Sequence, residues 1–421
     1  MIHTVELIFV ISGAELRLIT DQLKKLDAKR QKEIDAFGEN PEKKLHRGFT
    51  QLSIPGILAV TLYKHKYFPY IDNVYIKITI EPEALCQNKE TNRLFCAMKN
   101  NIEVLQQKYA AAIYQLFPNA FMAEPYYLEN EQRYRGLGSL PYLACAKVSR
   151  IDYAVNLYSV NKEVTLELAK NSYLNGRKKL KDFDRSNHNI YASTKTNSRV
   201  CKLYDKQRCY REKQHVTSDL YEEAEGVIRF EVQIVNPNTD WLVKHSNHFD
   251  FVNISGALPY LNEDIANNVI RKEYAHIGFH DWYSDYEHKK IIRASDLSTK
   301  GKDILTRQIS PIISQSRGVL AAQGNYITGQ YTIAKTQNIV KGTKATFRKH
   351  LKEYEQIGLQ PLRIPDRICE RHRINHIENP FERVVLQGEE HNIGMEKFLP
   401  EPIQERYNKV LAENFCMPEI A

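Results

Sequence analysis

The chain has 421 residues, of which 42% are hydrophobic and 26% charged, and these ordinary proportions argue against disorder and predict a globular protein of about two domains. Its longest apolar runs, such as Leu7–Ile11, are far shorter than the roughly 20 residues that cross a bilayer, so no membrane segment is expected. The formal net charge of +8 favours a polyanionic partner. Because the opening residues lack a secretion signal and the seven cysteines form no Cys-x-x-Cys pair, we expect a cytoplasmic protein with free thiols.

An opening strand is predicted over residues 5–12, and four later segments alternate apolar and polar residues with the period of a β-strand. These segments are 74–81, 149–158, 199–206 and 226–235. Because residues two apart share a face of a strand, each segment has one apolar and one polar face. The polar faces carry Lys77 and Glu81; Arg150, Asp152 and Asn156; Lys202, Tyr204 and Lys206; and Arg229 and Glu231.

Helical spacing of apolar residues predicts amphipathic helices over 94–117 and 162–174, which would cover the apolar side of such a sheet. We therefore predict an α+β fold, with a mostly antiparallel sheet, helices on one face and an open face that bears the candidate catalytic residues, over residues 1–255. Capping signals predict a smaller helical domain over 256–360, a candidate for DNA binding or partner docking. Residues 361–421 are rich in proline and charge and are predicted to form an extended, partly ordered tail.

The polar face combines residue types that suit phosphoryl transfer. The carboxylates of Asp152 and Glu231 could hold a hard cation such as Mg²⁺ or Mn²⁺. Tyr204 is a candidate nucleophile, and Lys202 and Lys206 could stabilise its phenolate. The remaining cations, which are candidates for binding DNA phosphate, are Arg150, Arg229, Lys202 and Lys77. The ordinary alternative is a sheet with cross-strand salt bridges and no catalytic role.

Three of these segments resemble a known family. "VSRIDYAVNLYS", "CKLYDKQRC" and "GVIRFEVQI" are similar, in order and separation, to the Arg-Ile-Asp, Tyr-x-Lys and Arg-Phe-Glu signatures of filamentous-phage gene II-type replication initiators. The wider similarity is to the initiators of rolling-circle plasmids. The resemblance covers about residues 148–235, and it extends less strongly to 74–87.

The resemblance implies Tyr204 as the nicking and joining nucleophile, Lys206 as its helper, and Asp152 and Glu231 as metal ligands. Two positions depart from the family pattern. Cys209 stands where relatives often have an acid, and Asn156 stands where plasmid relatives often have a second Asp. The third metal ligand is therefore open, with Asn156 and Glu81 as candidates.

Two further possibilities concern other residues. Tyr210 is a second candidate nucleophile, although it is expected to lie beyond the end of the strand. A competing nuclease class binds its metal through two histidines on either side of one hydrophobic residue, and the histidine pairs of this chain have the wrong spacing for that motif.

The resulting prediction is a rolling-circle DNA replication initiator of a filamentous phage or related element, which is a site-specific single-strand endonuclease and ligase. It would nick a duplex origin through a 5′-phosphotyrosine intermediate and rejoin the displaced single strand as a circle. A host helicase and polymerase would be its partners in the bacterial cytoplasm. Two alternatives stay open: a mobilisation relaxase with the same tyrosine chemistry, and a non-enzymatic protein that binds the origin or single-stranded DNA.

Overall fold

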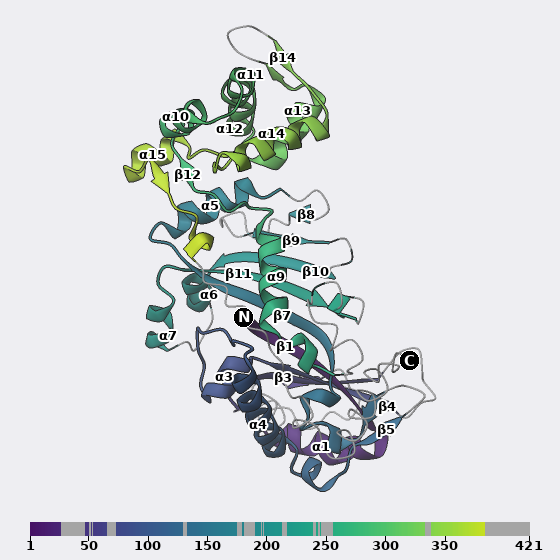
Figure 1. The fold of residues 1–421 in the computed structure, drawn as a ribbon. Coiled ribbons are helices and arrows are strands. Elements are labelled where there is room, and N and C mark those ends of the chain that lie inside the picture. Colours follow the sequence, from purple (N-terminus) through teal and green to yellow (C-terminus); the bar gives the residue numbers. More distant parts are fainter. Residues whose placement is uncertain are drawn as a thin grey trace, which may run out of the picture. The chain divides into compact units, whose positions relative to one another are not determined.

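The computed structural model describes most of the first 383 residues (Figure 1). The described residues are 1–26, 47–49, 52, 54–64, 73–128, 133–174, 179–180, 190–194, 196, 198–212, 217–238, 241–242, 245, 256–332 and 338–383. Within these residues no helix is both long enough and apolar enough to span a membrane. Most of the tail predicted over 361–421 lies outside them.

Nine strands of the described part form one sheet, in the order β2-β3-β4-β1-β7-β11-β10-β9-β8. Their bounds are β1 Ile2–Ser12, β2 Arg47–Phe49, β3 Ile57–Lys64, β4 Asn73–Ile80, β7 Lys147–Tyr158, β8 Lys179–Leu180, β9 Ile190–Ser193, β10 Arg199–Asp205 and β11 Val227–Val235. The pairings β2–β3, β3–β4, β4–β1, β1–β7, β10–β9 and β9–β8 are antiparallel. This sheet and the helices around it confirm the predicted α+β class.

The chain divides into two compact units. The described residues of unit 1 fall in Met1–Ala154 and Gln233–Val269, and those of unit 2 fall in Val155–Val232 and from Ile270 onward. The strands β7 and β11 each contribute residues to both units. The units are therefore discontinuous in sequence, whereas the sequence suggested consecutive domains.

In unit 1, the apolar side of the sheet is covered by helices. Strand β4 buries Val74, Ile76, Ile78 and Ile80 completely, as the alternation predicted. Helices α1 (Gly13–Leu26) and α3 (Pro82–Gln87) pack against β1, and both contact α4 (Lys99–Leu116), which lies within the predicted helix over 94–117. A hairpin of β5 (Tyr126–Leu128) and β6 (Arg133–Arg135) completes the unit's regular structure among the described residues.

A β-bulge interrupts β1 near its start. Ile2 pairs with Tyr153 and Thr4 with Asp152, so two steps along β1 match one step along β7. His3 is the extra residue of this bulge. Because a bulge turns the side chain of its extra residue out of strict alternation, His3 does not follow the face that its position in the strand would predict.

Unit 2 contains the predicted second helix and most of the C-terminal helices. Helix α5 (Lys162–Ser172) packs against β10, and α9 (Glu263–Tyr274) begins in unit 1 and ends in unit 2. The other helices are α6 Lys206–Glu212, α7 Ser218–Glu223, α10 Asp285–Ala294, α11 Thr299–Ile304, α12 Ser310–Gln315, α13 Val319–Thr328, α14 Lys344–Gln356 and α15 Asp366–His372. Short strand pairs join β12 (Trp282–Tyr283) to β15 (His376–Ile377) and β13 (Tyr331–Thr332) to β14 (Ile339–Val340).

Strand β10 ends one residue earlier than the alternation predicted. The Oδ1 atom of Asp205 accepts a hydrogen bond from the backbone N–H of Arg208 at 3.1 Å, which caps the start of α6. Lys162 holds the same carboxylate at 3.1 Å. Lys206 is therefore the first residue of a helix, and the prediction that it shares a strand face with Lys202 and Tyr204 is wrong.

Candidate active site

The candidate site is built on the middle strands of the sheet. Strand β7 carries Arg150, Asp152 and Asn156, and β11, its neighbour, carries Arg229 and Glu231. Strand β10 lies on the other side of β11 and carries Lys202 and Tyr204. Asp152 and Arg229 are 0% exposed and Glu231 is 3% exposed, so the carboxylates sit at a buried part of the polar face.

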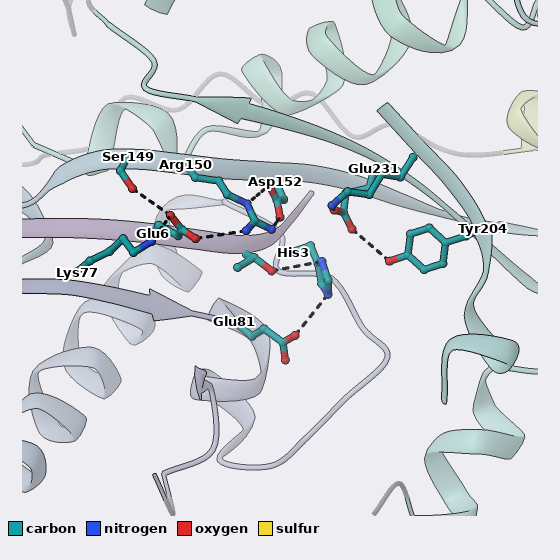
Figure 2. Close-up of polar contacts among 11 residues, drawn as sticks. His3, Glu6, Lys77, Glu81, Ser149, Arg150, Asp152, Tyr204 and Glu231 are labelled. Carbon is teal, nitrogen blue, oxygen red and sulfur yellow. Dashed lines mark hydrogen bonds and ion pairs between the residues drawn. The ribbon is translucent and has the colours of Figure 1, made fainter. Parts of the chain in front are cut away.

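Glu231 connects the candidate nucleophile to a cation. Its Oε2 atom accepts a hydrogen bond from the hydroxyl of Tyr204 at 3.2 Å, which Figure 2 shows. Its Oε1 atom lies 2.5 Å from the Nζ atom of Lys202. Because a carboxylate buried without a partner is costly, Lys202 stabilises the ionised form of Glu231. The phenol of Tyr204 is thereby placed against an acceptor for its proton.

The environment of Tyr204 favours the neutral phenol. Burial raises its pKa well above the ordinary value, the charge of Glu231 raises it further, and Arg229 acts in the opposite direction. The sequence suggested that nearby lysines stabilise a phenolate. In the structure Lys202 is instead bound to Glu231, so Tyr204 needs a proton acceptor when it reacts.

A second polar network, in unit 1, surrounds Asp152. Arg150 donates from Nε to Oδ1 of Asp152 at 2.9 Å, and its Nη2 contacts Oδ2 of the same carboxylate. Arg150 also reaches Glu6 on β1 at 3.3 Å, and Glu6 accepts from Lys77 at 3.3 Å and from Ser149 at 3.2 Å (Figure 2). Bidentate pairing holds the Asp152 carboxylate in a defined orientation.

Two residues of unit 1 can each offer a metal ligand at one point. A ring nitrogen of His3 and a carboxylate oxygen of Asp152 lie within 4.8 Å of each other. Ligands that share one divalent ion at about 2.1 Å lie up to about 4.2 Å apart, which is comparable with this separation. An imidazole and a carboxylate are ordinary ligands for Mn²⁺ and related ions, and the donor pair therefore fits a divalent cation.

His3 was missed by reasoning from the sequence. His3 is not part of a histidine pair, and strict alternation places it on the opposite face from Glu6. The bulge at Ile2–Thr4 changes that geometry. His3 also contacts Glu81, with Nε2 and Oε1 3.5 Å apart, and such a carboxylate can orient a ligating imidazole (Figure 2). Glu81 thus lies next to a candidate ligand, and its own role as a ligand stays a prediction.

The other predicted residues occupy different surroundings. The amide oxygen of Asn156 accepts from Nε of Arg229 at 2.9 Å. Lys206 lies over the ring of Tyr210, 4.5 Å from its centroid. Tyr210 is itself buried in α6 against Leu220 and Ala224, beyond the strand end as expected.

The four predicted phosphate contacts are all engaged with protein groups. Lys77 and Arg150 bind carboxylates in unit 1, and Lys202 and Arg229 bind Glu231 and Asn156 in unit 2. Arg229 has no exposed surface. Their role toward DNA stays a prediction, and for Arg229 the structure supports a positioning role.

The chain was compared with family models, curated proteins and solved structures, and nothing matches in any of the three comparisons.

Proposed function

We propose that this protein initiates rolling-circle DNA replication by nicking one strand of a duplex origin and later rejoining the displaced strand. The observation that carries the proposal is the contact between Tyr204 and Glu231, with Lys202 at the same carboxylate. It pairs a nucleophile with a proton acceptor whose charge is neutralised by a cation. All three side chains belong to one compact unit.

The proposed reaction is a transesterification. The Oη atom of Tyr204 attacks the phosphorus of the scissile phosphodiester, and the bond from phosphorus to the 3′ oxygen breaks. Because the raised pKa keeps the phenol protonated at neutral pH, Glu231 takes the proton during the attack and passes it to the departing 3′ oxygen. The products are a 5′-phosphotyrosyl enzyme and a free 3′-hydroxyl. No water is consumed, so attack by a 3′-hydroxyl on the phosphotyrosine rejoins the strand.

A divalent cation held by His3 and Asp152 of unit 1, with Glu231 as the further ligand predicted from the sequence, would supply charge neutralisation at the reacting phosphate. We propose Mg²⁺ or Mn²⁺, since two of the three donors are carboxylates. Arg150 keeps the carboxylate of Asp152 oriented for that role. A free 3′-hydroxyl primes synthesis, so a polymerase and a helicase of a bacterial host are the expected partners, and the host cytoplasm is the expected location.

The test uses supercoiled plasmid that carries the DNA flanking the gene, with purified protein and Mg²⁺. We expect an open-circular product with protein bound covalently to a 5′ end. Tyr204→Phe should lower the nicking rate by at least about a thousandfold, because the nucleophile is removed. Tyr158→Phe is the matched control, because that tyrosine is 65% exposed at the end of β7, and its nicking rate should be unchanged.

Tyr210→Phe tests whether Tyr210 is a second nucleophile. If it is, this variant should complete the first cleavage but not a second cycle of cleavage. Unaltered nicking by Tyr204→Phe would overturn the assignment of the nucleophile, and nicking that survives a chelator would overturn the metal. A mobilisation relaxase would give the same covalent product, and origin DNA from a mobilisation locus would then be its preferred substrate. A binding protein without activity would give no covalent product in any variant.

A further inference from the structure

Helix α14 carries a row of cations on its exposed face. Lys344, Arg348 and Lys352 follow one another at intervals of four residues, so they lie on one side of the helix about 6 Å apart along its axis. Lys349 stands beside them and Lys341 just before the helix, and all five are exposed. The opposite side, with Phe347, His350 and Tyr354, is buried and anchors the helix in unit 2.

None of these five cations makes an ion pair within the part of the chain that the structure describes. Other cations of the same unit do form such pairs: Lys289 binds Asp285 at 2.6 Å and Arg307 binds Asp303 at 2.7 Å. The two acids of α14, Glu353 and Glu355, stand toward its C-terminal end, and Glu353 is bound to His350 at 2.8 Å. From Lys344 to Lys352, all the charged residues on the exposed face of α14 are therefore cations.

This arrangement does not serve the stability of the helix. The first turn of α14 has no acid and its last turn has no base, although the helix dipole favours the reverse at both ends. Cations four apart also repel one another by about 0.2–0.5 kcal/mol per pair. Helix α10 follows the dipole instead, with Asp285 and Glu287 in its first turn and Arg293 in its last. The charge pattern of α14 therefore indicates an external anionic partner.

We propose that the exposed face of α14 binds the phosphate backbone of duplex DNA. A DNA strand carries one phosphate for every ~3.4 Å of its axis, so three cations spread over about 12 Å of α14 can each reach a phosphate through their long side chains. The contact reads no bases, so it would hold the duplex in place and leave sequence selection to other residues. DNA is chosen as the polyanion because of the proposed function, and α14 belongs to the same compact unit as Tyr204.

The experiment measures binding of the full chain to a fluorescent 30-base-pair duplex of arbitrary sequence, without divalent metal, at several salt concentrations. In the triple variant Lys344→Gln, Arg348→Gln, Lys352→Gln the slope of log Kobs against log salt should become shallower by about 2.7, which corresponds to three lost phosphate contacts. The control variant Arg271→Gln, Lys272→Gln, Lys290→Gln removes the same charge from exposed positions of α9 and α10 and should leave the slope nearly unchanged. A charge-retaining variant, Lys344→Arg with Lys352→Arg, should bind like the wild type.

Equal slopes for the triple variant and the control variant would overturn the proposal, and would be expected if an acidic protein were the partner of this face. Because binding is measured without metal, the result is independent of nicking. A chain that binds through α14 but never forms a covalent product would retain this inference and lose the proposed function. If the chain nicks DNA but the triple variant has the salt slope of the wild type, the proposed function is retained and this inference is lost. Thermal unfolding of each variant checks that all are folded.

Discussion

Two buried carboxylates of the candidate site are each matched by one cation. Glu231 is held by Lys202, and Asp152 is held by Arg150 through both carboxylate oxygens. Removing one partner of such a pair leaves an uncompensated buried charge, which is strongly destabilising. A divalent cation would add charge to the same carboxylates, so its binding would compete with or loosen these pairs. Metal binding should therefore change the contacts that Lys202 and Arg150 make with these carboxylates.

Metal affinity tests the role of His3. In His3→Gln the carboxylates remain but the imidazole is lost, so we expect the affinity for Mn²⁺, measured by isothermal titration calorimetry on the full chain, to fall by at least about tenfold. The control is His372→Gln, which changes an exposed histidine of α15 and should leave the affinity unchanged. Equal affinities in the two variants would exclude His3 as a ligand.

At the level of single elements, alternation correctly predicted the buried faces of β4, β7 and β11 and the polar residues opposite them. It could not predict where those patterns end or shift. The end of β10 depends on the hydrogen bond that the Arg208 backbone N–H donates to the Asp205 carboxylate, because this bond competes with continuation of the strand at Lys206. The position of His3 depends on a register shift against β7. Glu6 was not a candidate because its importance follows from its pairing with Arg150, and cross-strand register is not visible in one strand.

The start of helix α14 is stabilised by a side-chain cap, and the contribution of this cap to stability can be measured. The Oγ1 atom of Thr343 accepts a hydrogen bond from the backbone N–H of Thr346 at 3.1 Å and caps the helix. Thr343→Ala should lower the free energy of unfolding of unit 2 by about 1 kcal/mol, because the first turn loses this acceptor. Thr343→Ser keeps the hydroxyl and should be close to the wild type. Urea unfolding followed by circular dichroism measures both, and equal losses in the two variants would point to side-chain packing instead of the cap.

At the scale of the whole molecule, the two units could not be predicted from the order of the chain. Strands β7 and β11 run through both, and α9 begins in unit 1 and ends in unit 2. Composition and periodicity report on consecutive residues, so they favoured a division near residue 255. The observed division depends on which segments pack together across long separations in sequence, and a single sequence carries little signal for such contacts.

The stability of the molecule should decrease between neutral and mildly acidic pH through His288. Burial lowers the pKa of this histidine to about 4, with Lys289 contributing in the same direction and the hydrogen bond from Nε2 to the Gln360 backbone oxygen opposing it. The unfolded chain has a histidine pKa of about 6.5, so as pH falls below that value the unfolded state takes up a proton that the folded state refuses. The contribution of neutral His288 is therefore intact above about pH 7 and is lost progressively as pH falls toward 4, by about 2 kcal/mol at pH 5.

His288→Gln retains a donor toward Gln360 but cannot titrate, so its thermal midpoint should fall less between pH 7 and pH 5 than that of the wild type. The difference should be roughly 4–8 °C, given the usual shift per kcal/mol for a unit of this size. His372→Gln, at an exposed position, controls for titration in general and should follow the wild type. If the thermal midpoint of His288→Gln falls as much as that of the wild type, the acid sensitivity comes from another group. Protonation of His288, which packs against Tyr354, would then not be what destabilises the fold.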